Sequence, residues 1–212
     1  MNDPKVKIAV LDYGMGNLRS ASKALEHVGA KVDVTPDHDR IGAADALVLP
    51  GVGAFPEAMR RIREQGLDRL IAARVAEGTP LLGICLGMQL LFERSDEHGG
   101  AEGLGLLPGS VRALDARGRK LPHIGWSPIA FERPSPLSAG FASEEPFYFV
   151  HSFVAEARPE HVIAGASHGE RFAAVVGSER VFGTQFHPEK SSGAGLRMLG
   201  NFVATAAPLP VA

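Results

Sequence analysis

The chain has 212 residues, with 22 Lys and Arg against 24 Asp and Glu, so its formal net charge is −2 at pH 7. This length suits one domain with a substantial core, and we expect a single domain over residues 1–212 with its core in residues 5–206. The sequence has no dense basic tract, so we expect no nucleic-acid partner. It has no apolar run of membrane-spanning length and no signal-peptide pattern, so we expect no membrane partner. A single cysteine fits a reducing compartment, and we expect a cytoplasmic protein.

The first half of the chain alternates strand and helix patterns, which is typical of a parallel sheet covered by helices on both faces. Expected strands cover residues 7–11, 31–35, 46–49 and 81–84, and helical apolar spacing covers residues 18–28, 57–65 and 67–77. Ligands bind such sheets beyond the carboxyl ends of the strands. We therefore expect Tyr13, Gly51 and Cys85 to emerge at one edge.

The second half, after Gly103, shows short strand patterns separated by Gly and Pro. Residues 110–114, 147–150, 162–166, 171–176 and 181–186 are predicted to extend the sheet with strands of mixed direction. A final helix is expected to begin after Ser191 and Ser192 and to run to about Ala206, with Leu196, Leu199 and Val203 on its inner face. The expected fold is α/β: a single-domain, open, mostly parallel sheet flanked by helices.

Cys85 lies at the centre of a Gly-Ile-Cys-Leu-Gly segment, residues 83–87, between an apolar strand and the helix-like residues 88–92. This is the pattern of a nucleophile elbow, in which glycines two residues before and after allow a sharp turn around a strained central residue. A helix start favours thiolate over thiol. A lone cysteine is more often buried and inert, so the prediction of an exposed nucleophile depends on partners elsewhere.

Two such partners follow the strand pattern that ends at Phe186. Pro188 ends the strand, which places His187 at its end. A histidine titrates near neutrality and can take a proton from a thiol and return one to a leaving amine. Glu189, two residues on in an extended segment, falls on the same side and holds the imidazole in one tautomer. The sequence therefore predicts a Cys85, His187 and Glu189 triad.

These residues resemble the class I glutamine amidotransferases, whose triad has this chain order. Further similarity to the glutaminase subunits of imidazole glycerol phosphate synthases covers nearly the whole chain, in residues 12–18, 50–55, 83–89, 122–126, 148–152 and 185–190. The elbow and the His-Pro-Glu segment are shared by the class, whereas Tyr13–Asn17 and Pro122–Trp126 point to this subunit family. One departure is Ser127, where the family usually carries asparagine.

The resemblance implies that the triad hydrolyses glutamine to glutamate and ammonia through a thioester, with no cofactor or metal. The elbow geometry itself predicts that the backbone N–H of Leu86 stabilises the oxyanion. By resemblance residues 50–53 form the oxyanion strand, which gives the second donor to Val52 or Gly53. The resemblance also assigns the binding of substrate to Gly51, Gln89, His151 and Ser152.

The resemblance further implies a partner, because ammonia released into water is protonated and no longer nucleophilic. The chain shows no Gly-rich phosphate loop and leaves no room for an acceptor domain. The implied partner is a (β/α)8 barrel cyclase. In the resulting heterodimer the ammonia contributes to imidazole glycerol phosphate and an aminoimidazole carboxamide ribonucleotide in histidine biosynthesis. The residues expected to face this partner are Asn17, Trp126, Tyr148 and Lys190.

Three other interpretations remain open at this stage. The chain would be the glutaminase subunit of another class I synthase if the acceptor differed, although Pro122–Trp126 disfavours this. The chain would be a cysteine hydrolase or a metal-binding module if it used Cys85, His187 and His151. In the metal-binding module these three residues would be zinc ligands. A noncatalytic interaction domain is the weakest of the three.

Overall fold

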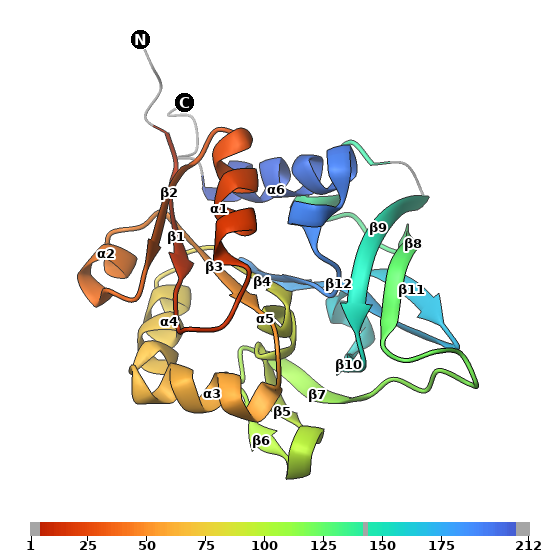
Figure 1. Cartoon of the computed structure of the whole chain (residues 1–212). Helices are drawn as coiled ribbons and strands as arrows, with labels where there is room; N and C mark the ends of the chain where they lie inside the picture. Colours follow the sequence, from red (N-terminus) through yellow and green to blue (C-terminus); the bar gives the residue numbers. More distant parts are fainter. Residues whose placement is uncertain (1–4, 142–143, 207–212) are drawn as a thin grey trace.

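The structure, a computed structural model, describes residues 5–141 and 144–206 (Figure 1). Its centre is a nine-stranded sheet to which both halves of the chain contribute. In spatial order the strands are β2 (Lys31–Thr35), β1 (Lys7–Leu11), β3 (Ala46–Gly51), β4 (Leu81–Cys85), β13 (Val181–Thr184), β12 (Glu170–Ser178), β11 (Val162–His168), β8 (His123–Phe131) and β9 (Glu144–His151).

The pairing direction changes within this sheet. Strands β2 to β13 pair in parallel, and strands β13 to β9 pair antiparallel. The expected fold class is confirmed, with the parallel pairing concentrated in the half that alternates strand with helix. Antiparallel neighbours such as β11 and β12 are joined by short turns and need no crossover helix.

Helices cover both faces of the sheet. They are α1 (Leu18–His27), α2 (His38–Gly42), α3 (Phe55–Glu64), α4 (Leu67–Ala76), α5 (Leu86–Gln89) and α6 (Ser192–Ala206). Helices α1 and α6 pack on one face, and α2, α3 and α4 on the other (Figure 1). Strand β1 supplies both cores, since Ile8 and Val10 point to the first face and Ala9 and Leu11 to the second.

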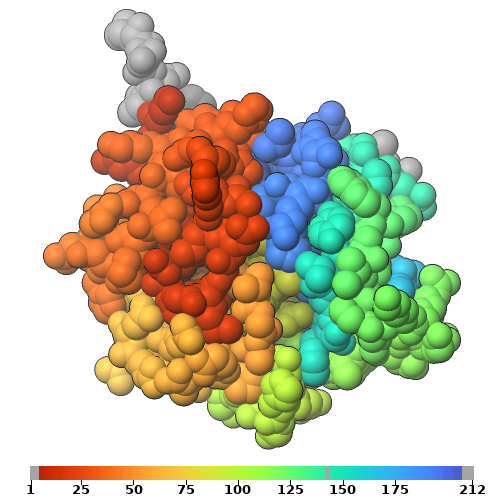
Figure 2. Space-filling model, viewed as in Figure 1, coloured from red at the N-terminus to blue at the C-terminus, as the bar shows by residue number. Residues whose placement is uncertain are grey.

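A second, four-stranded sheet lies beside the first. Its strands, in spatial order, are β10 (Phe153–Ala157), β7 (Leu107–Ala113), β5 (Phe92–Ser95) and β6 (Ala101–Glu102). Short 3-10 turns complete the described chain: η1 (Glu97–Gly99), η2 (Pro136–Ser138), η3 (Pro159–His161) and η4 (Pro188–Lys190). In the space-filling view, α6 packs between the N-terminal half and the β8–β9 region (Figure 2).

Several expected elements need correction. The strand predicted at residues 110–114 lies in the second sheet and does not extend the first. The helix-like residues 88–92 do not form a helix beyond Gln89, because the chain turns at Leu90 and Phe92 begins β5. Strand β8 was not expected, since Gly125 and Pro128 interrupt its apolar pattern.

The inner face of α6 also differs from the prediction. Gly195, Met198, Leu199 and Phe202 are its buried residues, whereas Leu196 and Val203 only border the core. The outermost parts of the predicted domain, residues 1–4 and 207–212, lie outside the described residues. Within the described ranges, every helix is too short or too polar to cross a membrane.

Candidate active site

The carboxyl ends of three neighbouring parallel strands meet at one edge of the large sheet. Gly51, at the end of β3, pairs in register with Cys85, at the end of β4. Tyr13 follows β1, and its buried hydroxyl donates a hydrogen bond to the Pro50 carbonyl at 2.9 Å. Burial, and then the nearby Cys85 thiolate, raise the pKa of Tyr13 well above its usual value, so the hydroxyl stays a donor.

Cys85 has the backbone conformation that the elbow pattern predicts. Its φ is +55° and its ψ is −111°, in a region that side chains rarely adopt, and α5 begins at the next residue. A Cβ on Gly87 would overlap the Leu49 carbonyl, and one on Gly83 would lie 2.5 Å from the Gly87 carbonyl oxygen. Both glycines are therefore required for α5 to pack against the strands.

One detail of the nucleophile prediction is wrong, and another is weakened. Cys85 is only 7% exposed, so its thiol opens to a cleft and not to the surface. Helix α5 has four residues, so the helix dipole acts on the thiol less than a full helix would.

His187 and Glu189 form a buried pair. Nδ1 of His187 donates to Oε1 of Glu189 at 2.8 Å, and each side chain is 2% exposed. Glu189 reaches the ring from the 3-10 turn η4 and not from the extended segment that we expected. The hydrogen bond fixes the tautomer, which leaves Nε2 as the nitrogen available to the nucleophile.

Burial by itself lowers the pKa of His187, but the negative charges of Cys85 and Glu189 outweigh it and raise the pKa to about 9. The contact with Glu189 is a formed hydrogen bond, whereas that with Cys85 is not. The thiol is directed instead at the Val150 carbonyl, 3.8 Å away, and none of the described residues bonds to Nε2 of His187. We therefore attribute the raised pKa first to Glu189.

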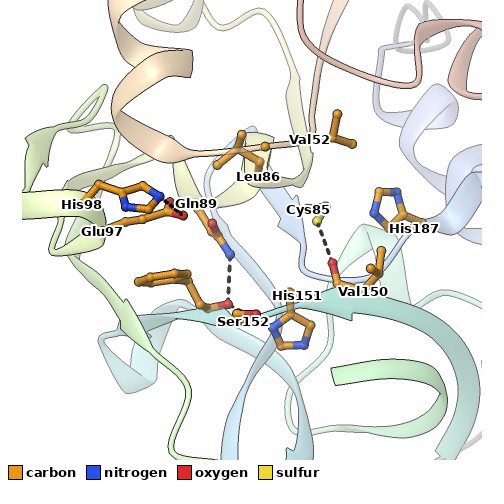
Figure 3. Close-up of a pocket in the computed structure, with 12 residues that line it drawn as sticks. Val52, Cys85, Leu86, Gln89, Glu97, His98, Val150, His151, Ser152 and His187 are labelled. Atoms are coloured by element: carbon orange, nitrogen blue, oxygen red, sulfur yellow. Dashed lines mark hydrogen bonds and ion pairs between the residues drawn. The ribbon is translucent and has the colours of Figure 1, made fainter. Parts of the chain in front are cut away.

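Cys85 and His187 line the same cleft, which has a volume of about 370 Å³ (Figure 3). The thiol is hydrogen-bonded to the Val150 carbonyl and not to the imidazole. The other lining residues are Val52, Gly53, Leu86, Gln89, Glu97, His98, Val150, His151, Ser152 and Phe153. The volume lies within the range of small-ligand sites.

The expected oxyanion donors Leu86, Val52 and Gly53 line the same cleft as Cys85. Leu86 is the first residue of α5, a position whose N–H has no partner within the helix. Val52 is 43% exposed and Gly53 has a φ of +96°, so this loop adopts a conformation that favours glycine. A Cβ on Gly51 would lie 2.6 Å from the Tyr13 hydroxyl, so only a glycine fits beside it.

Gln89 is 4% exposed and reaches the cleft from α5. Its Nε2 donates to the Phe153 carbonyl at 3.0 Å and to Oε1 of Gln185 at 3.1 Å. The Gln185 amide lies 3.9 Å from the sulfur of Cys85. Sequence reasoning gave Gln185 no role of its own, and its position just before Phe186 and His187 was the available signal.

His151 and Ser152 line the cleft, but the His151 imidazole is already occupied. Its Nδ1 bonds to the Phe153 carbonyl at 2.9 Å and its Nε2 to Nδ1 of His123 at 3.0 Å. Figure 3 shows its ring turned away from the sulfur of Cys85. Any contact of His151 with a ligand therefore comes from its backbone.

Sequence reasoning missed Glu97, which lines the cleft from η1. Its side chain is 11% exposed, and Oε2 accepts a hydrogen bond from the Phe55 backbone N–H at 2.8 Å. No motif or periodicity marks this segment. Only the folding of residues 92–102 over the cleft reveals the carboxylate.

The four residues expected to face a partner lie on elements that contact one another. Asn17 precedes α1, Lys190 ends η4, and both β9 and α1 contact η4. Trp126 and Tyr148 are paired across β8 and β9, with ring centroids 6.2 Å apart. Trp126 is 52% exposed, and the Tyr148 carbonyl accepts from the His187 backbone N–H at 2.9 Å.

The metal-site interpretation gains no support from the geometry. In the ranges 5–141 and 144–206, no three His, Cys, Asp or Glu side chains are grouped so that they could hold a metal ion.

Comparison with known proteins identifies the family of the chain. Residues 9–206 match the family model described as "Glutamine amidotransferase class-I". The chain is 50% identical to the "Imidazole glycerol phosphate synthase subunit HisH" of Moorella thermoacetica, over 92% of this chain and 93% of that protein. It is also 50% identical to the protein of the same name from Bacillus subtilis, over 94% and 97% of the two chains.

Solved structures with lower identity share the fold. A crystal structure described as a glutamine amidotransferase has a TM-score of 0.75 at 22% identity, over 94% of this chain and 98% of that one. A chain in the structure of PurLQS from Thermotoga maritima has a TM-score of 0.75 at 21% identity, over 95% and 99%. The chain thus belongs to the class I glutamine amidotransferases and, within them, to the family of HisH subunits of imidazole glycerol phosphate synthase.

Proposed function

We propose that this protein hydrolyses glutamine to glutamate and ammonia, with Cys85 as nucleophile, His187 as acid and base, and Glu189 as the orienting carboxylate. The observation that carries the proposal is the cleft in which a strained Cys85 and the buried His187–Glu189 pair occur together. This arrangement supplies the nucleophile, the proton carrier and the orienting group that amide hydrolysis requires.

The reaction begins when the Cys85 thiolate turns toward the substrate and attacks the side-chain amide carbon. The negative oxygen of the tetrahedral intermediate is stabilised by the N–H of Leu86 and by an N–H of Val52 or Gly53. The His187 imidazolium protonates the departing nitrogen, which leaves as ammonia and gives a γ-glutamyl thioester. Water then loses a proton to His187, attacks the thioester and releases glutamate, restoring the Cys85 thiolate and the His187 imidazolium with which the reaction began.

The amino-acid end of glutamine has matching groups in the cleft. Both hydrogens of the Gln89 amide are used within the protein, so its Oε1 remains as an acceptor for the substrate ammonium. The Glu97 carboxylate offers a second, charged acceptor on the same cleft. Ser152 and the backbone of His151 line the same cleft and contribute further polar groups. Gly51, which precedes the cleft-lining Val52, contributes its backbone in this proposal.

We further propose that the ammonia passes to a (β/α)8 barrel cyclase in the cytoplasm, in a heterodimer that makes imidazole glycerol phosphate. The HisH relatives are named as subunits of that synthase. An apolar surface suited to a partner is present on β8, where Ile124 and Trp126 are 57% and 52% exposed on the same side of the strand. Asn17, Tyr148 and Lys190 complete the proposed interface.

Substitution of the nucleophile tests the proposal. In a complex with the cyclase and its nucleotide substrate, Cys85→Ala should abolish synthesis from glutamine and leave synthesis from added ammonium salts intact. Glutamine turnover by Cys85→Ala would exclude the mechanism. Failure of the cyclase to bind the wild-type chain, with glutaminase activity present, would instead redirect the partner proposal to another synthase.

A further inference from the structure

Two buried histidines lie behind the cleft, and the triad does not use them. His123 and His151 are 3% and 6% exposed and lie opposite each other in the register of β8 and β9. Nδ1 of His123 is 3.0 Å from Nε2 of His151. Two ring nitrogens at this distance share a single hydrogen, so one ring donates and the other accepts.

The direction of this hydrogen bond follows from the other hydrogen bond of His151, which joins its Nδ1 to the Phe153 carbonyl. The Phe153 carbonyl can only accept, so Nδ1 of His151, 2.9 Å away, must carry the hydrogen. Burial, and less strongly the neighbouring histidines, lower the pKa of His151 to about 3, so the ring is neutral and Nε2 is an acceptor. His123 therefore donates from Nδ1.

The hydrogen bond between His123 and Ser127 fixes the His123 ring in the same way. Burial first, and then the charges of His168 and Arg119, lower the pKa of His123 to about 4, so its Nε2 is also an acceptor. The Ser127 hydroxyl lies 2.9 Å from this nitrogen and donates to it. The hydrogen bonds thus run in one direction, from Ser127 through both rings to Phe153.

The neighbouring rings hold His123 in this position. Phe149 and His168 both stack on it, with centroids 5.0 Å and 4.2 Å away, and Phe172 approaches both His123 and His151 edge-on. His168 is not part of the chain of hydrogen bonds, because its Nε2 donates to the Lys120 carbonyl. Aromatic contacts on several sides leave His123 few ways to change its partners.

The chain ends on the group that orients Gln89. The Phe153 carbonyl accepts both from Nδ1 of His151 and from Nε2 of Gln89, at 2.9 and 3.0 Å. With its second hydrogen on Gln185, the Gln89 amide has one orientation only, and its Oε1 is left for a ligand. Fixing the Phe153 carbonyl therefore fixes the acceptor that a substrate meets.

We propose that His123 and His151 are positioning residues for the glutamine site, held by the Ser127 hydroxyl. The chain of hydrogen bonds keeps the Phe153 carbonyl in place and, through it, the Gln89 acceptor. The expected effect on KM rests on the proposed glutaminase function. The protonation and hydrogen bonding of the two rings do not depend on that function.

The structural part is tested by nitrogen-15 NMR of the histidine rings in the wild-type protein at pH 7. Both His123 and His151 should be neutral and carry their hydrogen on Nδ1. Free neutral histidines have no such constraint, so two Nδ1–H tautomers are a specific result. A charged ring or an Nε2–H tautomer at either position overturns the proposal, whether or not the protein hydrolyses glutamine.

The positioning role is tested by the steady-state kinetics of glutamine hydrolysis. His123→Phe keeps an aromatic ring but cannot donate to His151, so KM should rise about three- to tenfold, as for one lost neutral hydrogen bond, with kcat within about twofold. His168→Phe keeps the ring that stacks on His123 and leaves the chain intact, and should retain the wild-type KM. An equal rise in both variants would assign the effect to packing and overturn the proposal.

Ser127 provides a second pair of variants that perturbs packing less, because this side chain is only half-buried. Ser127→Ala removes the donor to His123 and should raise KM in the same way. Ser127→Thr keeps the hydroxyl and should have the wild-type KM. An unchanged KM in both Ser127→Ala and His123→Phe refutes the positioning role. Absence of glutamine hydrolysis in the wild-type complex refutes the proposed function instead, and the ring tautomers then decide the inference alone.

Discussion

His151 should make the folded protein sensitive to mild acid. Its pKa is lowered to about 3 in the folded state, chiefly by burial, against about 6.5 in an unfolded chain. Below pH 6.5 the unfolded chain therefore binds a proton that the folded protein does not. The free energy of unfolding then falls by about 1.4 kcal/mol per pH unit from this residue.

Between pH 6.5 and pH 5 this amounts to about 2 kcal/mol, a large part of the stability of an ordinary domain. The sign is that of a group with a depressed pKa: the stability is complete above pH 6.5 and is lost progressively toward pH 3. The measurement is urea unfolding at pH 7 and pH 5, followed by circular dichroism, for the wild type and for His151→Asn. Asparagine does not titrate and its amide nitrogen still reaches the Phe153 carbonyl.

We expect His151→Asn to be less stable at pH 7, because Nδ1 of His123 loses its acceptor. Its loss of stability between pH 7 and pH 5 should nevertheless be smaller than that of the wild type by about 2 kcal/mol. His98→Asn is the matched control, since the His98 side chain is 74% exposed, and should lose as much as the wild type. Equal losses in the wild type and His151→Asn would refute the assignment of the acid sensitivity to His151.

Three other predictions concern the elbow, the triad and the proposed interface. Gly87→Ala should lower the melting temperature sharply, because the new Cβ overlaps the Leu49 carbonyl. Gly193→Ala is the control and should leave the melting temperature nearly unchanged, because a Cβ there meets nothing within 4 Å. Equal melting temperatures of the two variants would contradict this account of the elbow. Glu189→Gln should reduce kcat for glutamine about 10²-fold or more with little change in KM, measured by glutamate release, and an unchanged kcat would remove Glu189 from the mechanism. Trp126→Ala should weaken binding of the cyclase about tenfold or more, as measured by calorimetry. The melting temperature of the free chain should stay nearly unchanged, because the Trp126 ring is half exposed. An unaltered affinity would place the interface elsewhere.

The sequence by itself determined the local features that carry the chemistry. Glycines on both sides of Cys85 predicted the elbow because no other residue tolerates the contact of α5 with the Leu49 carbonyl. The short spacing from His187 to Glu189 predicted their hydrogen bond. The strand predicted to run to Phe186 was too long, because β13 ends at Thr184 and His187 follows in a short non-strand segment. Alternating strand and helix patterns predicted the parallel half of the sheet, because buried parallel strands and their crossover helices have distinct apolar periods.

Only the tertiary structure decided which distant groups meet. Glu97 enters the cleft because β5 and β6 fold over it, and no local pattern records that packing. The pairing of His123 with His151 depends on the register of β8 and β9, which Gly125 and Pro128 conceal in the sequence. The direction of the Cys85 thiol, toward Val150 and not His187, is likewise a matter of side-chain rotation within a packed cleft. Sequence periodicity reports burial along one element, whereas these contacts arise between elements, and their energies depend on geometry that exists only after folding.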